Sequence, residues 1–170
     1  LLDGVFSHTG EDSLYFNRYG RYPGKGAYQS RESKYYPWYR FMRFPDRYAC
    51  WWNFPTLPEV NKDCPSYREF ILGPKGIARH WIHHGASGWR LDVANEIDLE
   101  FMREMRRQVR AVHPEAYIVG EIWHSAEPWL RGDTLDGVTA YPWRDGALAF
   151  FSGWRADAAI QGLGRTNRTN

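Results

Sequence analysis

Apolar residues along the chain fall into four short runs separated by polar or helical stretches. The runs cover residues 1–6, 89–93, 116–120 and 135–139. Each run is short, rich in β-branched, leucine or aromatic side chains, and close to a glycine, which is typical of buried strands. Four strands are therefore predicted.

Helical patterns lie between these runs. From Asp98 to His113, apolar side chains recur every three to four residues, which predicts an amphipathic helix that starts at an aspartate and is closed by Pro114. Residues 67–72 and 77–82 are two further helical stretches, separated by a Gly-Pro pair that breaks or kinks a helix. Strands that alternate with helices predict βαβ units and a parallel sheet, and hence the α/β class.

A long irregular excursion follows the first predicted strand. Residues 15–54 hold 15 of the 29 aromatic residues and eight Lys or Arg against two acidic residues, without helical or alternating periodicity. Such a segment fits a platform for sugar rings, a loop domain that packs its own aromatic side chains, or a groove for single-stranded nucleic acid. The nucleic-acid interpretation is the least favoured, because the basic residues follow no known module signature.

Length and composition narrow the class further. A closed (β/α)₈ barrel needs about 250 residues, so 170 residues that include a long excursion predict part of a barrel. The net charge of +2, the mean hydropathy of −0.64 and the lack of a long apolar run indicate neither a polyanionic partner nor a membrane span. The chain starts without Met or a signal pattern, so we expect a piece of a longer protein, and its compartment stays open. Cys50 and Cys64 are expected to be free thiols.

The carboxyl ends of parallel strands are where active sites of such sheets form. His8, Asp92 and Glu121 are the polar residues near the ends of apolar runs. Asp92 and Glu121 are separated by about one βα unit, and neighbouring strands lie about 4.8 Å apart, so the two carboxylates should face each other at about 5 Å. That separation is typical of a retaining glycosidase. The alternative is that each carboxylate only caps the following helix.

The neighbours of the two carboxylates suggest different protonation states. Arg90 lies on the same face of its strand as Asp92 and can hold that carboxylate ionised. Trp123 lies close to Glu121, and partial burial beside Asp92 should raise the pKa of Glu121 and keep it protonated. Asp92 is then the nucleophile, and Glu121 the acid and then the base.

Several short segments carry a resemblance to a known family. They are Asp3-Gly4-Val5-Phe6-Ser7-His8, Leu57-Pro58-Glu59-Val60-Asn61, Gly88-Trp89-Arg90-Leu91-Asp92-Val93-Ala94-Asn95-Glu96 and Gly120-Glu121-Ile122-Trp123-His124. In this order they resemble the conserved regions of the α-amylase family, glycoside hydrolase family 13. The Asn95-Glu96 pair and the segment 129–133 are most similar to its neopullulanase, cyclomaltodextrinase and maltogenic amylase branch.

The resemblance implies a fold and a set of site residues. It implies a TIM barrel of which this chain supplies strands three to about six, with residues 9–64 as an insertion similar to the family's domain B, so that residues 1–170 are one fragment of a catalytic domain. It implies Asp92 as nucleophile and Glu121 as acid/base. The residues that it implies for substrate binding are His8, Arg90, Asn95, Glu96, Trp123 and His124, while Asp3 is a supporting residue.

The chain departs from the family pattern at two places. Ser7 stands where many α-amylases have an Asn that ligates calcium, so no metal or cofactor is expected. The family's third carboxylate follows a His in a His-Asp pair, and this chain contains no such pair. We therefore expect the fragment alone to be inactive.

Two clusters are expected to be structural. His80, His83 and His84 share a helix face, but no carboxylate accompanies them in a metal-binding arrangement. Arginines at 103, 106, 107 and 110 are expected to form an exposed helix face.

The expected function is a retaining hydrolase that cleaves α-1,4-glucosidic bonds in maltooligosaccharides, cyclodextrins, starch or pullulan. A transglycosylase with the same mechanism and a non-catalytic carbohydrate-binding relative are the alternatives. Expected partners are an α-glucan substrate, without nucleic acid or membrane, and a homodimer of the complete enzyme is left open.

Overall fold

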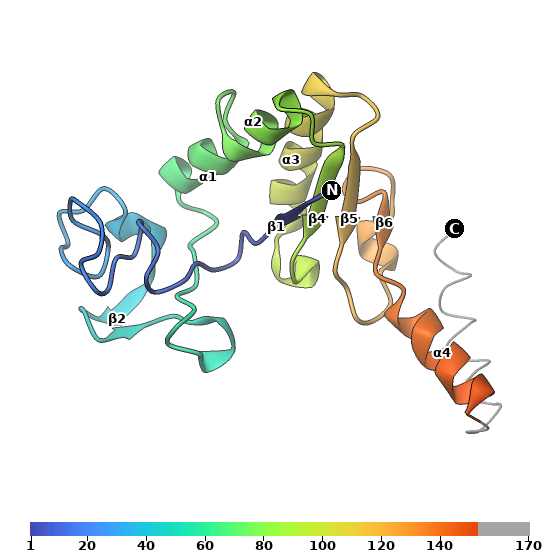
Figure 1. Ribbon diagram of the computed structural model, residues 1–170, viewed down its shortest axis with the longest axis horizontal. Helices are drawn as coiled ribbons and strands as arrows, with labels where there is room; N and C mark the ends of the chain where they lie inside the picture. The colour runs from blue at the N-terminus through green and yellow to red at the C-terminus, as the bar shows by residue number, and fades with distance from the viewer. Residues whose placement is uncertain (153–170) are drawn as a thin grey trace. The chain divides into compact units, whose positions relative to one another are not determined.

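The computed structural model describes residues 1–152, which form two compact units. We call residues 1–4 together with 85–152 the sheet unit, and residues 5–84 the loop unit. Figure 1 shows both, coloured from the N-terminus to the C-terminus.

The sheet unit is built on four parallel strands. They are β1 (Leu2–Gly4), β4 (Gly88–Leu91), β5 (Tyr117–Gly120) and β6 (Gly137–Val138), and they lie in this order across the sheet (Figure 1). The four predicted strands and their parallel arrangement are confirmed, although each is shorter than its apolar run. In the second run the strand β4 ends at Leu91, because Val93 takes a left-handed backbone conformation.

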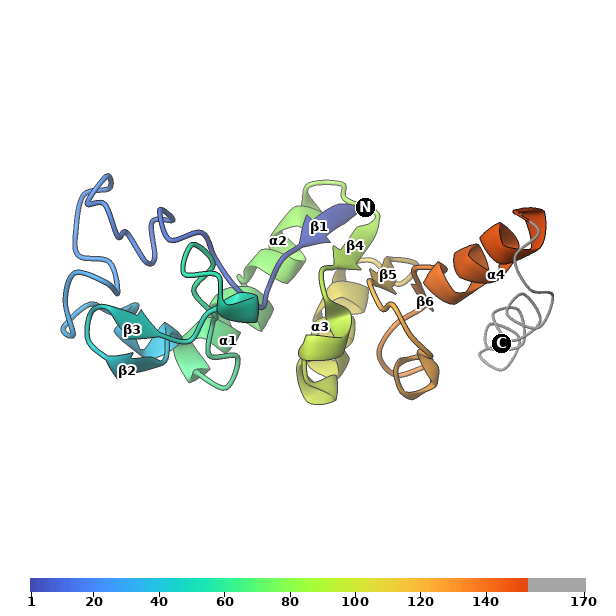
Figure 2. The ribbon, with the colours of Figure 1, turned by 90° about the horizontal axis from the view of Figure 1, so that it is seen from below.

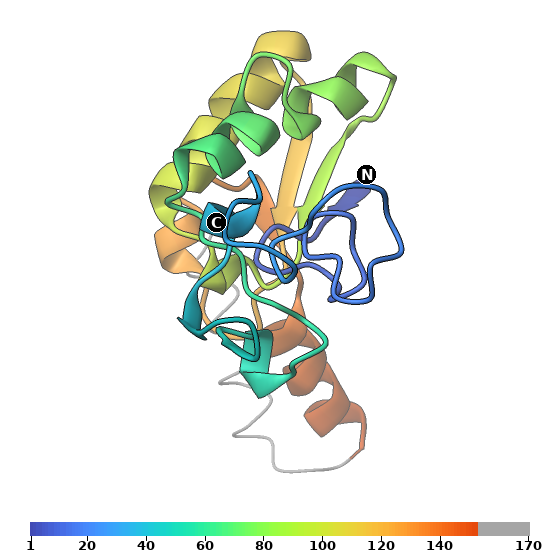
Figure 3. The same ribbon diagram turned by 90° about the vertical axis from the view of Figure 1, so that its left-hand side faces the viewer.

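The predicted helix between the second and third strands is confirmed as α3 (Leu99–Val112). The Asp98 side chain caps it by accepting a hydrogen bond of 2.8 Å from the Phe101 N–H. Phe101, Met102 and Met105 are buried, and α3 lies along one face of the sheet (Figures 2 and 3). The unit also contains the 3₁₀ helices η3 (Ala94–Glu96) and η4 (Glu127–Trp129), and α4 (Tyr141–Phe151) after β6.

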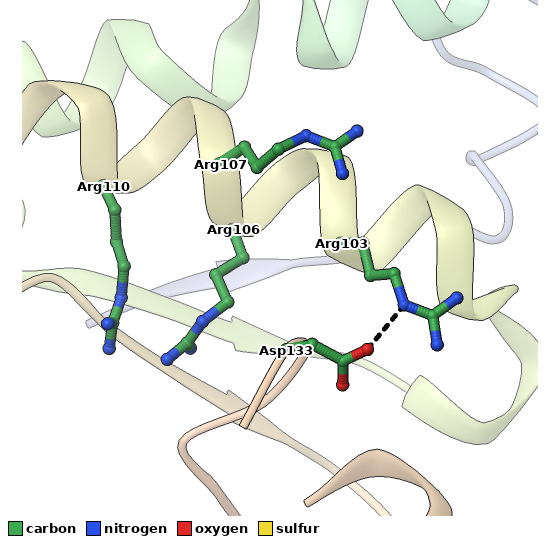
Figure 4. Close-up of a pocket in the computed structure, with 5 residues that line it drawn as sticks. All are labelled: Arg103, Arg106, Arg107, Arg110 and Asp133. Carbon is green, nitrogen blue, oxygen red and sulfur yellow. Dashed lines mark hydrogen bonds and ion pairs between the residues drawn. The ribbon is translucent and has the colours of Figure 1, made fainter. Parts of the chain in front are cut away.

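The arginines of α3 correct one expectation from the sequence. Of the four, Arg107 is exposed, but the other three are half-buried because they bind carboxylates of the segment before β6. Arg103 contacts Asp133 at 2.6 Å (Figure 4). Arg106 and Arg110 contact one oxygen of Asp136 at 2.8 and 2.7 Å. The predicted exposed face is therefore an ion-pair network that joins α3 to the β5–β6 connection.

The loop unit contains short elements around an aromatic core. Its elements are η1 (Tyr36–Trp38), the antiparallel pair β2 (Phe41–Arg43) and β3 (Arg47–Tyr48) seen in Figure 2, η2 (Trp51–Asn53), α1 (Pro65–Leu72) and α2 (Ile77–His83). Phe16 is fully buried and its ring contacts the rings of Tyr39 and Tyr48 at centroid distances of 4.9 and 4.8 Å. Many of the concentrated aromatic residues thus fill the interior of this unit.

The two predicted helices after residue 64 are confirmed as separate helices. α1 ends at Gly73, and α2 starts after Gly76, so the Gly-Pro pair does interrupt the helix. Cys50 and Cys64 are free thiols, as expected. Over residues 1–152, no helix combines the length and the apolar character needed to cross a bilayer.

Candidate active site

Asp92 and Glu121 follow neighbouring strands at equivalent positions. In the sheet register Leu91 pairs with Gly120, so the residue after each strand end lies at the same edge. The ladder continues to both residues, because the Asp92 N–H donates to the Gly4 carbonyl at 3.2 Å and the Glu121 N–H donates to the Leu91 carbonyl at 2.9 Å. The backbone of both residues is thus fixed by the sheet.

One guanidinium group connects the carboxylates at this edge. Arg90 Nη1 lies 2.7 Å from an oxygen of Asp92 and 2.7 Å from an oxygen of Asp3, and Nη2 lies 2.7 Å from Glu121 Oε2. The predicted contact between Arg90 and Asp92 is present. The contact with Glu121 was not predicted, and it makes Arg90 a bridge between the two strands that carry the candidate pair.

Two further donors hold Glu121. The backbone N–H of Val93 donates to Oε2 at 3.2 Å, and the indole Nε1–H of Trp123 donates to Oε1 at 3.2 Å. Both carboxylate oxygens therefore have partners. The Glu121 side chain keeps only 12% of its surface exposed, against 19% for Asp92.

The pKa of Glu121 differs from the expectation. Burial by itself raises the pKa of the Glu121 carboxyl, as the sequence suggested, but the hydrogen bonds from Val93 and Trp123 and the positive charge of Arg90 lower it. The net result is a Glu121 pKa below its ordinary value, so the expected protonated carboxyl is wrong for this arrangement. Burial by itself lowers the pKa of Arg90. The hydrogen bonds that Arg90 donates to Asp3 and Asp92 outweigh burial, so the Arg90 pKa is raised.

Val93 connects the two candidate carboxylates through the backbone. It has φ 43° and ψ 52°, which is the left-handed region. That conformation is rare for a β-branched residue and costs about 1–3 kcal/mol. The turn places the Val93 N–H directly after Asp92 and toward Glu121. No signal in the sequence indicated this residue.

The glycine before Glu121 is required by close packing. A Cβ added at Gly120 would lie 2.4 Å from Leu135 Cδ1 and 2.9 Å from Ala94 Cβ. Both distances are shorter than real Cβ contacts allow, and the Ala94 N–H also donates to the Glu121 carbonyl at 3.0 Å. Gly120 thus lets η3 approach the end of β5 and bring the Val93 turn to Glu121.

The remaining candidate residues of the sheet unit lie on η3 and after the end of β5. Asn95 and Glu96 lie on η3, where Asn95 is exposed and Glu96 half-buried. The His124 ring contacts Trp129 at a centroid distance of 5.6 Å, and its Nδ1 lies 3.0 Å from the Ser125 carbonyl oxygen. Trp123, by contrast, is joined directly to Glu121, with 48% of its surface exposed.

His8 belongs to the loop unit. There it pairs with Glu59 in an isolated bridge, and its ring contacts Trp51 at a centroid distance of 5.2 Å. Ser7 beside it is buried, and its hydroxyl has no hydrogen-bond partner among residues 1–152. One hydroxyl does not supply the about six to eight oxygen ligands that calcium takes. In the part of the chain that the structure describes, no group of three or more His, Cys, Asp or Glu could hold a metal ion.

The sheet is parallel, and a pair of carboxylates bridged by Arg90 lies at neighbouring strand ends. This arrangement is typical of α/β catalytic domains, in which the active site lies at the carboxyl edge of the sheet. The family model described as Alpha amylase, catalytic domain, matches residues 1–163. The chain belongs to this family of glycoside hydrolases.

Relatives that are named as α-glucan-degrading enzymes agree with this assignment. The chain is 40% identical over 159 residues to a cyclomaltodextrinase from Geobacillus thermopakistaniensis, covering 89% of this chain and 25% of that relative. It is 37% identical over 176 residues to an amylopullulanase from Thermoanaerobacterium saccharolyticum, covering 92% and 14%. The chain therefore spans a quarter or less of the length of these curated relatives.

Solved structures show the same fold. The chain superimposes with a TM-score of 0.86, at 32% identity, on the cyclic alpha-maltosyl-(1-->6)-maltose hydrolase from Arthrobacter globiformis in complex with cyclic alpha-maltosyl-(1-->6)-maltose. The match covers 99% of this chain and 38% of that protein. The α/β fragment with its parallel sheet thus corresponds to part of the family's catalytic barrel domain.

Proposed function

We propose that this chain is part of a retaining glycoside hydrolase that cleaves α-1,4-glucosidic bonds in maltooligosaccharides, cyclodextrins, starch or pullulan. In this proposal the four strands are strands three to about six of the barrel, and residues 9–64 are its domain B. The family and the relatives supply the class of substrate. The bridge that Arg90 forms between Asp92 and Glu121 at the strand ends supports the retaining mechanism.

One observation carries the proposal: Asp92 and Glu121, from neighbouring strands, each lie 2.7 Å from a different nitrogen of the Arg90 guanidinium. Neighbouring strands are about 4.8 Å apart. A retaining enzyme needs its two carboxyl groups at about 5–5.5 Å, whereas an inverting enzyme leaves room for a water between them. The shared guanidinium favours the short separation.

In the proposed reaction Asp92 attacks the anomeric carbon and forms a covalent glucosyl ester, while Glu121 donates its proton to the leaving glycosidic oxygen. Glu121 then takes a proton from the water that attacks the ester, which releases the sugar and restores the Asp92 carboxylate. Arg90 supports the first step because its donated hydrogen bond keeps Asp92 ionised and oriented.

The first step needs a protonated Glu121, but the pKa of Glu121 is lowered in this arrangement. The complete site must therefore raise that pKa. The positive charge of Arg90 and the hydrogen bonds from Val93 and Trp123 favour the Glu121 carboxylate. A further acidic group from the rest of the barrel would offset the charge of Arg90 and raise the pKa of Glu121. The third carboxylate that the family resemblance implies would be such a group.

The other candidate residues are assigned to substrate binding. Trp123 is joined to Glu121 and half-exposed, which suits contact with the sugar on the leaving-group side. We assign Asn95, Glu96 and His124 to the same side and His8 to the sugar beside the cleaved bond. These roles rest on the family motifs and on the position of η3 and the β5 end in the sheet unit.

Kinetics of the complete enzyme test the proposal. Asp92→Asn and Glu121→Gln should each lower kcat on maltohexaose by about 10³-fold or more, because each removes a group that acts in the transition state. Glu121→Gln should still release a burst of fluoride from α-maltosyl fluoride, because fluoride leaves without a proton and only the second step then lacks its base. Near-wild-type hydrolysis of maltohexaose by either variant would contradict the assigned roles.

A further inference from the structure

The loop unit presents a stacked group of aromatic rings on its surface, which we call the aromatic array: Trp51, Trp52 and Phe54. The Trp51 and Trp52 rings are stacked at a centroid distance of 4.7 Å with an interplanar angle of 9°. Phe54 stacks on Trp51 at 6.4 Å and 27°. Trp52 is 55% exposed and Phe54 52% exposed. Neighbouring exposed aromatic rings make this surface a candidate interaction site.

The backbone of the aromatic array is held in a conformation that costs free energy. Trp52 has φ 47° and the next residue, Asn53, has φ 61°, both in the left-handed region. A bulky residue there is a genuine outlier, and such outliers concentrate at ligand-binding positions. In this case the turn displays a large apolar ring at the surface. The ring is only partly buried, so its burial does not fully offset the free energy that the backbone conformation costs.

The surrounding loop keeps this turn rigid. The Trp51 N–H donates to the Leu57 carbonyl at 2.9 Å, and the Phe54 N–H and the Leu57 N–H close two successive turns at 2.9 Å each. Cys50 pairs with Pro58 in an isolated bridge. A rigid, preformed ring surface binds a ligand with little loss of conformational entropy.

The aromatic array also adjoins a residue already assigned to sugar. The His8 ring contacts Trp51 at a centroid distance of 5.2 Å within the loop unit. The segments that carry them are joined by the backbone, because the Thr9 N–H donates to the Pro58 carbonyl at 3.1 Å. The aromatic array thus places an apolar ring surface next to the His8 imidazole.

From these observations we propose that Trp52, supported by Trp51, is a stacking platform for a glucosyl unit of an α-glucan chain. This inference rests on the proposed function for the class of ligand. The pyranose ring presents C–H groups on one face, which fit the face of an indole ring, and its hydroxyls remain available to polar neighbours. Phe54, which stacks on Trp51, extends the apolar surface.

The test measures binding and turnover separately in the complete enzyme. Binding of maltohexaose is measured by calorimetry in an Asp92→Asn background, where turnover does not consume the ligand. The variant is Trp52→Gly, because glycine accepts φ 47° without strain and the loop should fold as before. The matched control is Trp81→Ala, which removes an indole of 46% exposure on α2, outside the aromatic array.

Trp52→Gly should weaken maltohexaose binding by about tenfold or more, Trp52→Phe by less, and Trp81→Ala should leave the affinity unchanged. In the active enzyme Trp52→Gly should raise KM for maltohexaose with little effect on kcat for α-maltosyl fluoride. Circular dichroism and the unfolding midpoint confirm that the loop unit is intact.

The outcomes separate this inference from the proposed function. If the enzyme hydrolyses α-glucans but Trp52→Gly binds maltohexaose as tightly as its parent, the platform is wrong and the hydrolase stands. If no α-glucan is hydrolysed but binding depends on Trp52, the platform stands and the hydrolase is wrong. Absence of maltohexaose binding in the Asp92→Asn parent also overturns the platform.

Discussion

Glu121 depends on donors from three different places in the chain. Arg90 comes from the preceding strand, the Val93 N–H from the turn after that strand, and the Trp123 indole from two residues further along. Each of these contacts favours the carboxylate form, and together they outweigh burial. The protonation state of Glu121 is therefore set by the whole strand edge and not by one neighbour.

The Trp123 indole gives a prediction at this scale. Trp123→Phe keeps an aromatic ring but removes the N–H that donates to Glu121 Oε1. Loss of a hydrogen bond to the carboxylate raises the pKa of Glu121. Since the acid must be protonated, the basic limb of the kcat/KM profile of the complete enzyme should move to higher pH.

Val93→Gly is the control for that experiment. Glycine accepts φ 43° without strain and keeps the N–H, so the turn and its hydrogen bond to Glu121 should be retained. Its basic limb should stay where the wild-type limb lies. A Trp123→Phe limb that stays fixed or moves to lower pH would show that the Trp123 indole has no part in setting the Glu121 pKa.

At the level of elements, the strands and α3 were predictable from local patterns. The period of apolar residues and the Asp98 cap determine α3, and short apolar runs determine β4 and β5. The placement of Asp92 and Glu121 at one sheet edge follows from the parallel order. The contact of Arg90 with Glu121 and the left-handed conformation of Val93 depend on geometry between elements. No local sequence pattern contains that geometry.

The α3 arginines show the same limit. A run of charges on a helix usually indicates a solvated face, yet Asp136 accepts from Arg106 and Arg110 with one oxygen and from the Ile118 N–H with the other, at 2.9 Å. Only 14% of the Asp136 side chain is exposed. The partner lies 26 residues beyond Arg110 in the sequence, so its role becomes visible only in the folded chain.

Removing this partner should weaken the contact between α3 and the sheet. Asp136→Asn leaves two half-buried guanidinium groups without their carboxylate, which should lower the free energy of unfolding by about 2–3 kcal/mol. Urea unfolding of the complete enzyme measures it. Asp145→Asn breaks an exposed pair with Arg144 and should change the free energy by about 0.5 kcal/mol or less. Equal effects of the two variants would contradict the structural role of Asp136.

At the scale of the whole molecule, the sheet unit carries the carboxylate pair, and the loop unit carries His8 and the aromatic array. The chain matches the catalytic domain family over residues 1–163, but it spans a quarter or less of the two curated relatives compared. We therefore expect activity only when this chain is part of a complete barrel that supplies the third carboxylate.

Covalent labelling tests the assignment of Asp92 most directly. The complete enzyme carrying Glu121→Gln is incubated with α-maltosyl fluoride, whose departing fluoride needs no acid, while hydrolysis of the ester is slowed by the loss of the base. Peptide mass spectrometry should find a maltosyl group on the Asp92 side chain. Release of fluoride with an unmodified Asp92, or a label on another carboxylate, would contradict the account.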